Sequence, residues 1–116
     1  MSPIRGNMSN VIEITDDTFE KEIKNSEIPA IVDFWAEWCA PCKVIASLID
    51  DVAEEFKDKI KVCKINIDDN IRIATDLAVM NIPALVFFKD GKEAFRLTGT
   101  ISKNQLRKKI SELLNE

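Results

Sequence analysis

An apolar run that leads directly into a pair of cysteines constrains the fold of this chain more than any other feature. Residues 30–43 read AIVDFWAEWCAPCK, and the run from Ile28 to Trp35 lacks polar alternation, as is typical of a strand covered on both faces. A helix is expected to begin at the cysteines, where unpaired backbone N–H groups and the helix dipole favour the thiolate of Cys39. Cys42 can close a disulfide ring with Cys39 and can attack any mixed disulfide that Cys39 forms. Because Cys42 lies three residues inside the helix, we expect packing to hide it and only Cys39 to react readily.

Apolar periodicity on both sides of this stretch predicts alternating strands and helices. Two pairs have the N-cap and N3 spacing of a capping box, Asp17 with Glu20 and Ser102 with Gln105. An Asp-Gly pair at 90–91 predicts a tight hairpin, so the last two strands should be antiparallel. The expected strands are 11–14, 28–35, 60–67, 84–88 and 93–97, and the expected helices are about 17–24, 42–56, 69–78 and the segment after Ser102. This order, β-α-β-α-β-α-β-β-α, implies an α/β domain in which helices cover a mixed sheet.

The composition fits a single soluble domain. The chain has 116 residues, of which 46% are hydrophobic and 31% charged. Sixteen Lys and Arg against 20 Asp and Glu give a net charge of -4, without a basic tract, so nucleic acid is not an expected partner. No apolar run reaches membrane-spanning length, and residues 1–10 lack the apolar centre of a signal peptide. We therefore expect a cytoplasmic protein with no membrane association, a disordered extension at 1–10 and a folded domain at 11–116.

The segment WAEWCAPCK resembles the active-site segment of the thioredoxin family. Asp33 before it, Ile82-Pro83 after it and Gly99 before the last helix follow in the family's order, so the resemblance spans 11–116. It implies the thioredoxin fold, with five strands, four helices and the redox pair after the second strand. It also implies a protein-disulfide reductase, a general dithiol electron donor in cell redox homeostasis whose redox group is its own Cys39–Cys42 disulfide, with no other cofactor. The expected partners of this monomer are thioredoxin reductase and disulfide-containing target proteins.

The resemblance assigns a proton-transfer role to Asp33. Its position within an apolar run indicates burial, which raises the pKa of a carboxyl group, and the alternative is a solvated Asp at a strand edge. A buried acid near Cys42 can accept that thiol's proton during the second attack, which is the role of the matching family residue. Lys64 matches a family lysine near this acid, where its charge would oppose the effect of burial.

The remaining site residues are expected to shape the surface that binds targets. By resemblance, Pro83 is a cis proline facing the redox pair, and the Ile82 backbone pairs with an extended target segment; the alternative is a strand that starts at a proline. Trp38 is expected to shield the disulfide and offer a docking surface, although it could be an ordinary surface aromatic, and Trp35 is expected to pack beneath the site. The complete substrate-binding set is Trp38, Ala40, Pro41, Ile82, Pro83 and Gly99.

Other interpretations of the cysteines are less consistent with the sequence. Structural zinc normally needs four Cys or His ligands, and this chain has three cysteines and no histidine, so no metal is expected. Cys63 lies inside a strand and is expected to be a core residue, with a regulatory thiol as the alternative. The lack of histidine argues against the His-containing pairs of oxidases and isomerases. An oxidant or isomerase, and a binding module with incidental thiols, remain the rival functions.

Four residues depart from the family's usual pattern. Ala40 replaces a Gly, which favours the helix by up to about 1 kcal/mol. Ser47 replaces a helix-kinking Pro, which predicts a straighter helix. Asn81 replaces a Gly and Ala84 replaces a Thr on either side of Ile82-Pro83. These last two changes are expected to alter the shape of the target-binding surface.

Overall fold

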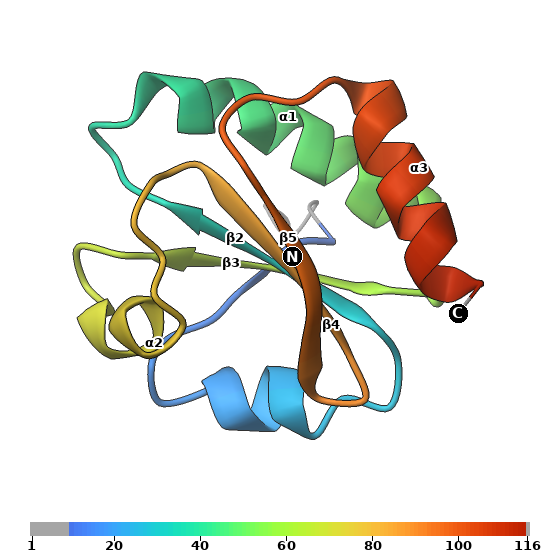
Figure 1. The fold of residues 1–116 in the computed structure, drawn as a ribbon, viewed down its shortest axis with the longest axis horizontal. Helices are drawn as coiled ribbons and strands as arrows, with labels where there is room; N and C mark the ends of the chain where they lie inside the picture. The colour runs from blue at the N-terminus through green and yellow to red at the C-terminus, as the bar shows by residue number, and fades with distance from the viewer. Residues whose placement is uncertain (1–9, 116) are drawn as a thin grey trace, which may run out of the picture.

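The apolar run identified in the sequence forms β2 (Ala30–Trp35), the central strand of a five-stranded sheet. The sheet order is β1-β3-β2-β4-β5, and β2 pairs in parallel with β3 and antiparallel with β4. This computed structural model describes residues 10–115 (Figure 1). The other strands are β1 (Ile12–Glu13), β3 (Lys61–Asn66), β4 (Ala84–Lys89) and β5 (Lys92–Thr98). The predicted mixed sheet with antiparallel last strands is therefore confirmed.

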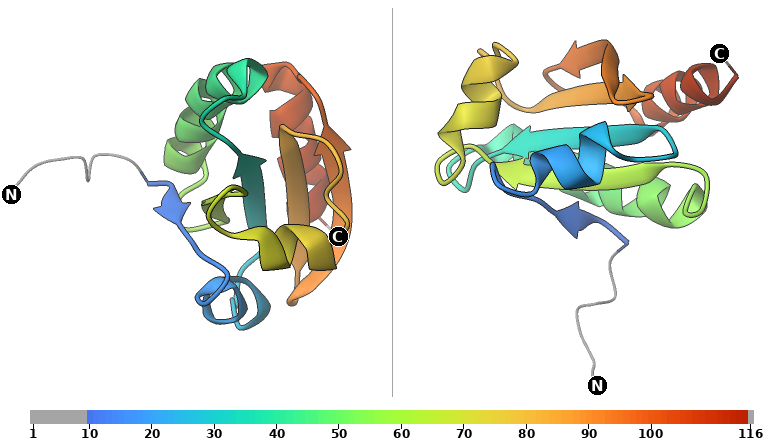
Figure 2. Two further views of the ribbon diagram at one scale, coloured as in Figure 1. Left: turned by 90° about the vertical axis from the view of Figure 1, so that its left-hand side faces the viewer. Right: turned by 90° about the horizontal axis from the view of Figure 1, so that it is seen from below.

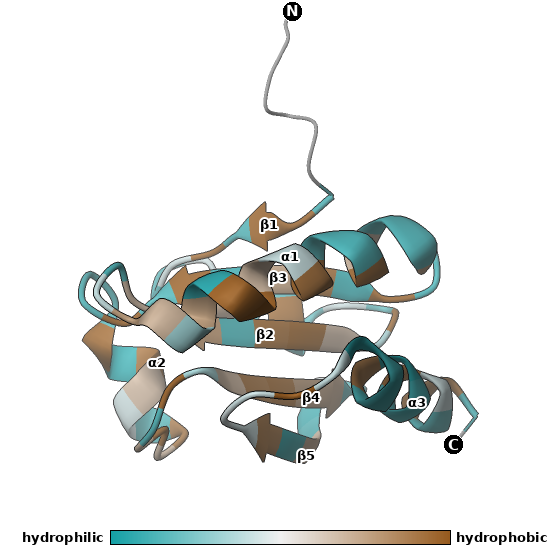
Figure 3. Ribbon diagram, turned by 90° about the horizontal axis from the view of Figure 1, so that it is seen from above, coloured by the Kyte–Doolittle hydropathy of each residue, from teal (hydrophilic) through white to brown (hydrophobic). Residues whose placement is uncertain are grey.

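Helices cover both faces of this sheet. α1 (Ala40–Glu55) and α3 (Lys103–Leu114) lie on one face, and η2 (Glu20–Lys24) and α2 (Ile71–Asp76) lie on the other (Figures 1 and 2). The outward side of α3 is mostly hydrophilic, whereas the strands beneath are mainly hydrophobic (Figure 3). Residues 10–115 thus contain five strands and four helices in the expected order, which confirms the predicted fold.

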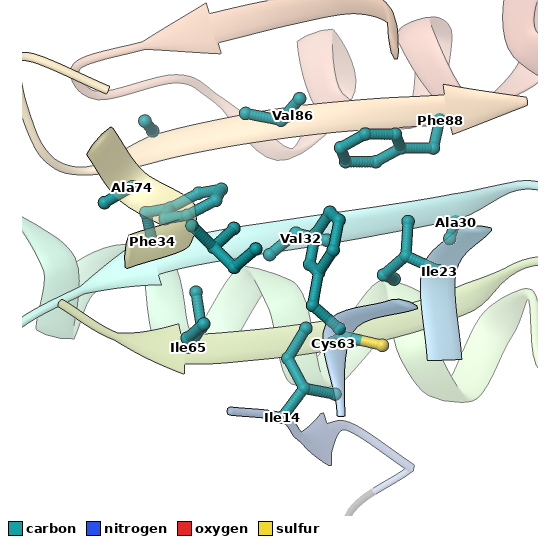
Figure 4. Packing of buried hydrophobic residues seen from close by; sticks show 13 residues of the cluster. Ile14, Ile23, Ala30, Val32, Phe34, Cys63, Ile65, Ala74, Val86 and Phe88 are labelled. Carbon is teal, nitrogen blue, oxygen red and sulfur yellow. The ribbon is translucent and has the colours of Figure 1, made fainter. Parts of the chain in front are cut away.

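Side chains of β2 enter two separate cores because neighbouring residues of a strand point to opposite faces. Ile31 packs beneath α1 and α3 with a cluster that includes Leu85, Phe87, Leu106 and Ile110. Val32 and Phe34 pack on the other face with residues from β3, β4, η2 and α2 (Figure 4). Asp33 has the parity of Ile31, so its carboxyl group lies on the α1 side. The strand is thus covered on both faces, as the apolar run predicts.

The helix ends differ in part from the sequence prediction. Ser102 and Gln105 form the predicted capping box at α3, with N-to-O distances of 2.8 and 3.1 Å. The predicted cap by Asp17 is wrong. At the start of this helical segment the cap is formed by Thr15 and Thr18 instead, and the Thr15 N–H donates a hydrogen bond to the Thr18 hydroxyl oxygen at 2.9 Å. The neighbouring Asp16 caps α2 instead, accepting the N–H groups of residues 72 and 73 at 3.1 and 3.0 Å. Such long-range capping depends on tertiary structure and leaves no local sequence pattern.

The hairpin between β4 and β5 confirms the Asp-Gly prediction. Asp90 has a φ of 55° and Gly91 a φ of 78°, the positive values that a tight type I′ turn requires. A Cβ atom at Gly91 would lie 2.6 Å from the Lys24 carbonyl oxygen, so glycine is needed for space as well as for conformation. The turn therefore packs directly against the end of η2.

Two further predictions concern the N-terminal extension and membrane-spanning helices. Nine of the ten residues predicted to form a disordered extension lie outside the described part. The tenth, Asn10, donates a hydrogen bond to Glu54 of α1 at 2.7 Å. Among residues 10–115, no helix has both the length and the apolar character needed to span a membrane. The exact bounds of the domain stay a prediction.

Replacing Gly91 by Ala should destabilise the fold more than the same change at Gly99. Both glycines have positive φ values, 78° and 81°, but a Cβ at Gly99 would meet no atom within 4 Å. Gly99→Ala should therefore cost about 1–2 kcal/mol in the free energy of unfolding, from backbone conformation alone. Gly91→Ala should cost roughly 3 kcal/mol or more because the clash with a backbone carbonyl adds to it. Equal losses in urea-induced unfolding would contradict the steric argument.

Candidate functional site

The redox pair lies where β2 gives way to α1. Residues 36–38 link the two elements, and Cys39 is the N-cap residue of α1 in an extended conformation. Cys39 and Cys42 form a disulfide with their Cα atoms 5.3 Å apart. The Cys42 N–H donates a hydrogen bond to the Cys39 sulfur at 3.2 Å. The predicted disulfide at the end of the second strand is confirmed, with one sulfur at the unpaired amides of a helix start.

Burial does not distinguish the two cysteines. Cys42 is 3% exposed, so its expected burial is confirmed, but Cys39 is only 4% exposed and is hidden to the same degree in the disulfide form. Their electrostatic environments do differ. Cys39 is at the start of α1, where its sulfur accepts an N–H and meets the positive end of the helix dipole. Cys42 is the third residue of α1, and it is the Cys39 sulfur that accepts a backbone N–H at the helix start.

An apolar cluster surrounds the disulfide. Ala36 and the two cysteines are buried together, with Trp35, Ile67 and Ile82 packed against them. Trp35 thus lies against the redox pair, as predicted. Ile67 was missed by sequence reasoning, although it follows β3, whose C-terminal end lies beside that of β2 in the parallel pairing. Its N–H donates a hydrogen bond to the Trp35 carbonyl at 3.0 Å, which extends the hydrogen bonding between β2 and β3 by one residue.

Trp38 lies outside that cluster and is 68% exposed. Its indole Nε1–H donates to Asp68 Oδ2 at 3.0 Å. This contact joins the loop before Cys39 to the segment that follows β3. The hydrogen bond fixes the orientation of an exposed aromatic ring next to the redox pair, and Asp68 is a second residue that sequence reasoning missed.

Asp33 is buried as predicted, with 3% of its surface exposed. Burial raises the pKa of its carboxyl group from 3.8 to about 7, and the positive charge of Lys64 partly opposes this rise. Lys64 is the residue opposite Asp33 in the β2–β3 pairing, and its Nζ lies 5.6 Å from the centre of the Trp35 ring. Asp33 Oδ1 has no hydrogen-bond partner among the described residues. The predicted proximity of Lys64 to this acid is therefore confirmed.

A half-open pocket of about 250 Å³ connects Asp33 with the Cys42 side of the redox pair. Both Asp33 and Cys42 line it. The volume is ample for water molecules, which can carry a proton between groups that do not touch. The remaining lining residues are Trp35, Glu37, Lys43, Ala46 and Lys64.

The segment before β4 completes the site. The Ile82–Pro83 peptide bond is cis, as the resemblance implies. Ile82 packs against the disulfide cluster, and the Pro83 carbonyl accepts the Gly99 N–H at 2.9 Å. Ala40 and Pro41 are exposed in the first turn of α1. The predicted site residues thus come from β2, the loop after it, the start of α1, β3, the cis-proline segment and the residue that follows β5.

Cys63 is separate from this site. It is fully buried among apolar residues of the second core, including Ile14 and Val32 (Figure 4). Burial raises the pKa of its thiol to about 12, with a smaller opposing effect of Lys61, so the reactive thiolate is scarce near neutral pH. Its interpretation as a core residue is confirmed. Among the described residues, no group of three or more His, Cys, Asp or Glu side chains is placed to hold a metal ion.

Comparisons with known proteins agree with this geometry. The thioredoxin family model matches residues 10–112. A thioredoxin from Pseudomonas aeruginosa is 43% identical over 97 residues, covering 84% of this chain and 90% of the relative. One from Haemophilus influenzae is 42% identical over 105 residues, covering 90% and 98%. Thioredoxin 1 from Nostoc sp. is 37% identical over 107 residues, covering 92% and 100%.

Asp33→Asn should stabilise the protein at neutral pH and change the dependence of stability on pH. Because the pKa of Asp33 is about 7 in the folded protein against an ordinary 3.8, the folded state binds this proton more tightly than the unfolded chain. The contribution of Asp33 to the free energy of unfolding is therefore greatest below about pH 4 and decreases as the pH rises to about 7. Between these pH values the free energy of unfolding should fall by roughly 4 kcal/mol because of Asp33, and the Asn variant should not show this fall.

Urea titrations between pH 4 and pH 8 measure this difference. Asp76→Asn, which changes an exposed carboxylate on α2, is the matched control and should leave the curve close to that of the unmodified protein. Parallel curves for the unmodified protein and Asp33→Asn would show that Asp33 does not titrate in this range.

Proposed function

Since this chain belongs to the thioredoxin family, we propose that Cys39 is the attacking thiol and Cys42 the resolving thiol of its disulfide exchange. The chain is a thiol-disulfide oxidoreductase that reduces protein disulfides with its own redox-active cysteine pair. The division of roles is supported by one observation above all. The Cys39 sulfur is at the start of α1 and accepts the Cys42 N–H, which stabilises a thiolate at that position.

The reaction proceeds in two exchanges. The Cys39 thiolate attacks one sulfur of a target disulfide, so a mixed disulfide forms and the other target sulfur leaves as a thiolate that takes up a proton. The Cys42 thiol then loses its proton and attacks the Cys39 sulfur. This displaces the second target sulfur as a thiolate, which takes up a proton, and leaves the Cys39–Cys42 disulfide. Two electrons have passed from the cysteine pair to the target.

Asp33 is the proposed acceptor of the Cys42 proton. A general base is most effective when its pKa lies near the working pH, and burial raises the pKa of Asp33 to about 7. The shared pocket gives water a route between the carboxyl group and the Cys42 sulfur. Lys64 keeps the pKa of Asp33 from rising further, so that part of the population remains a carboxylate at neutral pH.

Targets are proposed to bind over the cis-proline segment. The Ile82 backbone offers main-chain groups to an extended target segment, and such pairing accepts many sequences because every peptide has the same backbone. Pro83 and Gly99 shape one side of this surface, and Trp38, Ala40 and Pro41 shape the other. The exposed Trp38 ring, held by Asp68, supplies apolar contact area beside the attacking sulfur.

The wider setting follows from the same family. We propose that thioredoxin reductase returns electrons to the disulfide and that the protein acts as a cytoplasmic monomer. The redox chemistry is assigned to the cysteine pair alone, with no cofactor. A role as an oxidant or isomerase would require a less reducing cysteine pair, which a measurement of the reduction potential distinguishes.

Replacing Cys42 by Ser should trap target proteins on Cys39. The attack by Cys39 is retained but the resolving thiol is lost, so mixed disulfides should accumulate. After incubation with a disulfide-containing protein such as insulin, these adducts appear on non-reducing gels and disappear when a reducing agent is added.

Cys39→Ser is the control, and it should capture almost no target at the same concentration. Adducts in both variants would point to Cys63 or to reversed roles, and a Cys63→Ala background separates these two cases. If neither variant formed adducts while the unmodified protein still bound the target, the binding-module interpretation would gain support.

Asp33→Asn should slow resolution of the mixed disulfide more than its formation. Without the carboxylate, the Cys42 proton must leave to bulk water, so the second exchange should lose about 10- to 100-fold in rate near pH 7. The defect should shrink at higher pH, where hydroxide removes the proton. Rapid-mixing measurements on a preformed mixed disulfide test this, and an unchanged rate near neutral pH would remove Asp33 from the mechanism.

A further inference from the structure

One guanidinium group links β5 to the end of α2. Arg96 of β5 donates from Nη2 to the Leu77 carbonyl at 2.8 Å and from Nη1 to the Ala78 carbonyl at 3.4 Å. The Glu93 carboxylate accepts from Nε at 2.6 Å and from Nη2 at 2.7 Å. Both side chains are about 30% exposed. The ion pair itself contributes little stability at such exposure, but its two-point geometry fixes the direction in which the guanidinium points.

The two carbonyl groups that Arg96 contacts are at a sensitive position. Leu77 is the C-cap residue of α2, and Ala78 has a left-handed φ of 55°, which glycine usually adopts at this point of a helix end. The Val79 N–H then closes the helix end on the Ala74 carbonyl at 2.8 Å. Arg96 therefore donates hydrogen bonds to the carbonyl groups of a turn whose left-handed position is occupied by alanine and not by glycine.

The cis-proline segment begins immediately after this turn. Residues 80–82 lie outside regular secondary structure. Within the described residues, the backbone hydrogen bonds nearest to their two ends are Val79 N–H to Ala74 and Gly99 N–H to the Pro83 carbonyl, at 2.8 and 2.9 Å. Arg96 and Gly99 are three residues apart, so β5 and its end restrain the segment on both sides. The positions of the Ile82 main-chain groups thus depend on these two attachments.

We propose that Arg96, oriented by Glu93, is a positioning residue that holds the residue 80–83 segment in the conformation that binds target proteins. It acts through the Leu77 and Ala78 carbonyl groups and touches neither the target nor the sulfur atoms. This inference rests on the proposed pairing of targets with the Ile82 backbone. Arg96 should therefore matter for targets with an extended polypeptide segment and not for small disulfides.

Arg96→Met tests this, because it keeps an apolar stem and removes every guanidinium hydrogen bond. Two substrates are compared, insulin and 5,5′-dithiobis(2-nitrobenzoic acid), which has no peptide backbone to pair. The KM for insulin should rise about three- to tenfold with little change in kcat, and the reaction with the small disulfide should keep its rate. Arg96→Lys, which can reach one carbonyl, should recover part of the loss.

The matched control is Arg107→Met. Arg107 also pairs with a glutamate through two guanidinium nitrogens, at 2.7 and 3.1 Å from Glu55, but it joins α3 to α1 on the other face of the sheet. It should leave the KM for insulin unchanged. An equal rise in both arginine variants, or an equal loss with both substrates, would overturn the inference by indicating a general effect of surface charge or stability.

Amide hydrogen exchange separates this inference from the proposed pairing itself. Exchange at Val79 and Gly99 should become about tenfold faster in Arg96→Met, and exchange in β2 should keep its rate. Unchanged exchange at both amides would overturn the positioning role. Faster exchange with an unchanged KM for insulin would instead contradict target pairing at Ile82, and with it the claim that Arg96 serves target binding.

Discussion

The start of α1 directly after the central strand is the constraint on which the rest of the site depends. Burial of β2 on both faces fixes the point where the chain leaves the sheet. A loop of residues 36–38 follows, and Cys39 then caps α1. Its sulfur then accepts a backbone N–H that a helix start leaves unpaired. The parallel strand β3 brings Ile67 to the same edge, and antiparallel β4 brings Ile82 and Pro83 there. A buried sheet thus positions a reactive sulfur at a helix start, within a cluster of apolar side chains.

Asp33 shows that this site is maintained at a cost to stability. A carboxyl group on the α1 face of the central strand occupies a position where an apolar side chain would favour folding. The positive charge of Lys64 opposes the desolvation only in part. The same burial that destabilises the ionised form moves the pKa into the range needed for exchange of the Cys42 proton. Stability and reactivity therefore set opposite demands on this one residue.

Sequence patterns predicted the features that depend on local chemistry. The apolar run gave the central strand, Asp90-Gly91 the turn, Ser102 and Gln105 a helix cap, and the cysteine spacing the disulfide. Features that depend on distant parts of the chain were not visible. Asp16 caps a helix more than 50 residues away, Asp68 holds the Trp38 indole, and Arg96 reaches the end of α2. The equal burial of the two cysteines was also missed, because helix position alone does not describe what the neighbouring segments cover.

The most direct test of this account is the rate at which each thiol of the reduced protein reacts with iodoacetamide as a function of pH. Mass spectrometry of Cys63→Ala protein distinguishes modification at Cys39 from modification at Cys42. Stabilisation of the thiolate by the helix start predicts that Cys39 is modified first and already at pH values where an unperturbed thiol reacts slowly, with Cys42 following only at higher pH. Equal reactivity of the two thiols, or earlier modification of Cys42, would contradict the central claim that the start of α1 makes Cys39 the nucleophile.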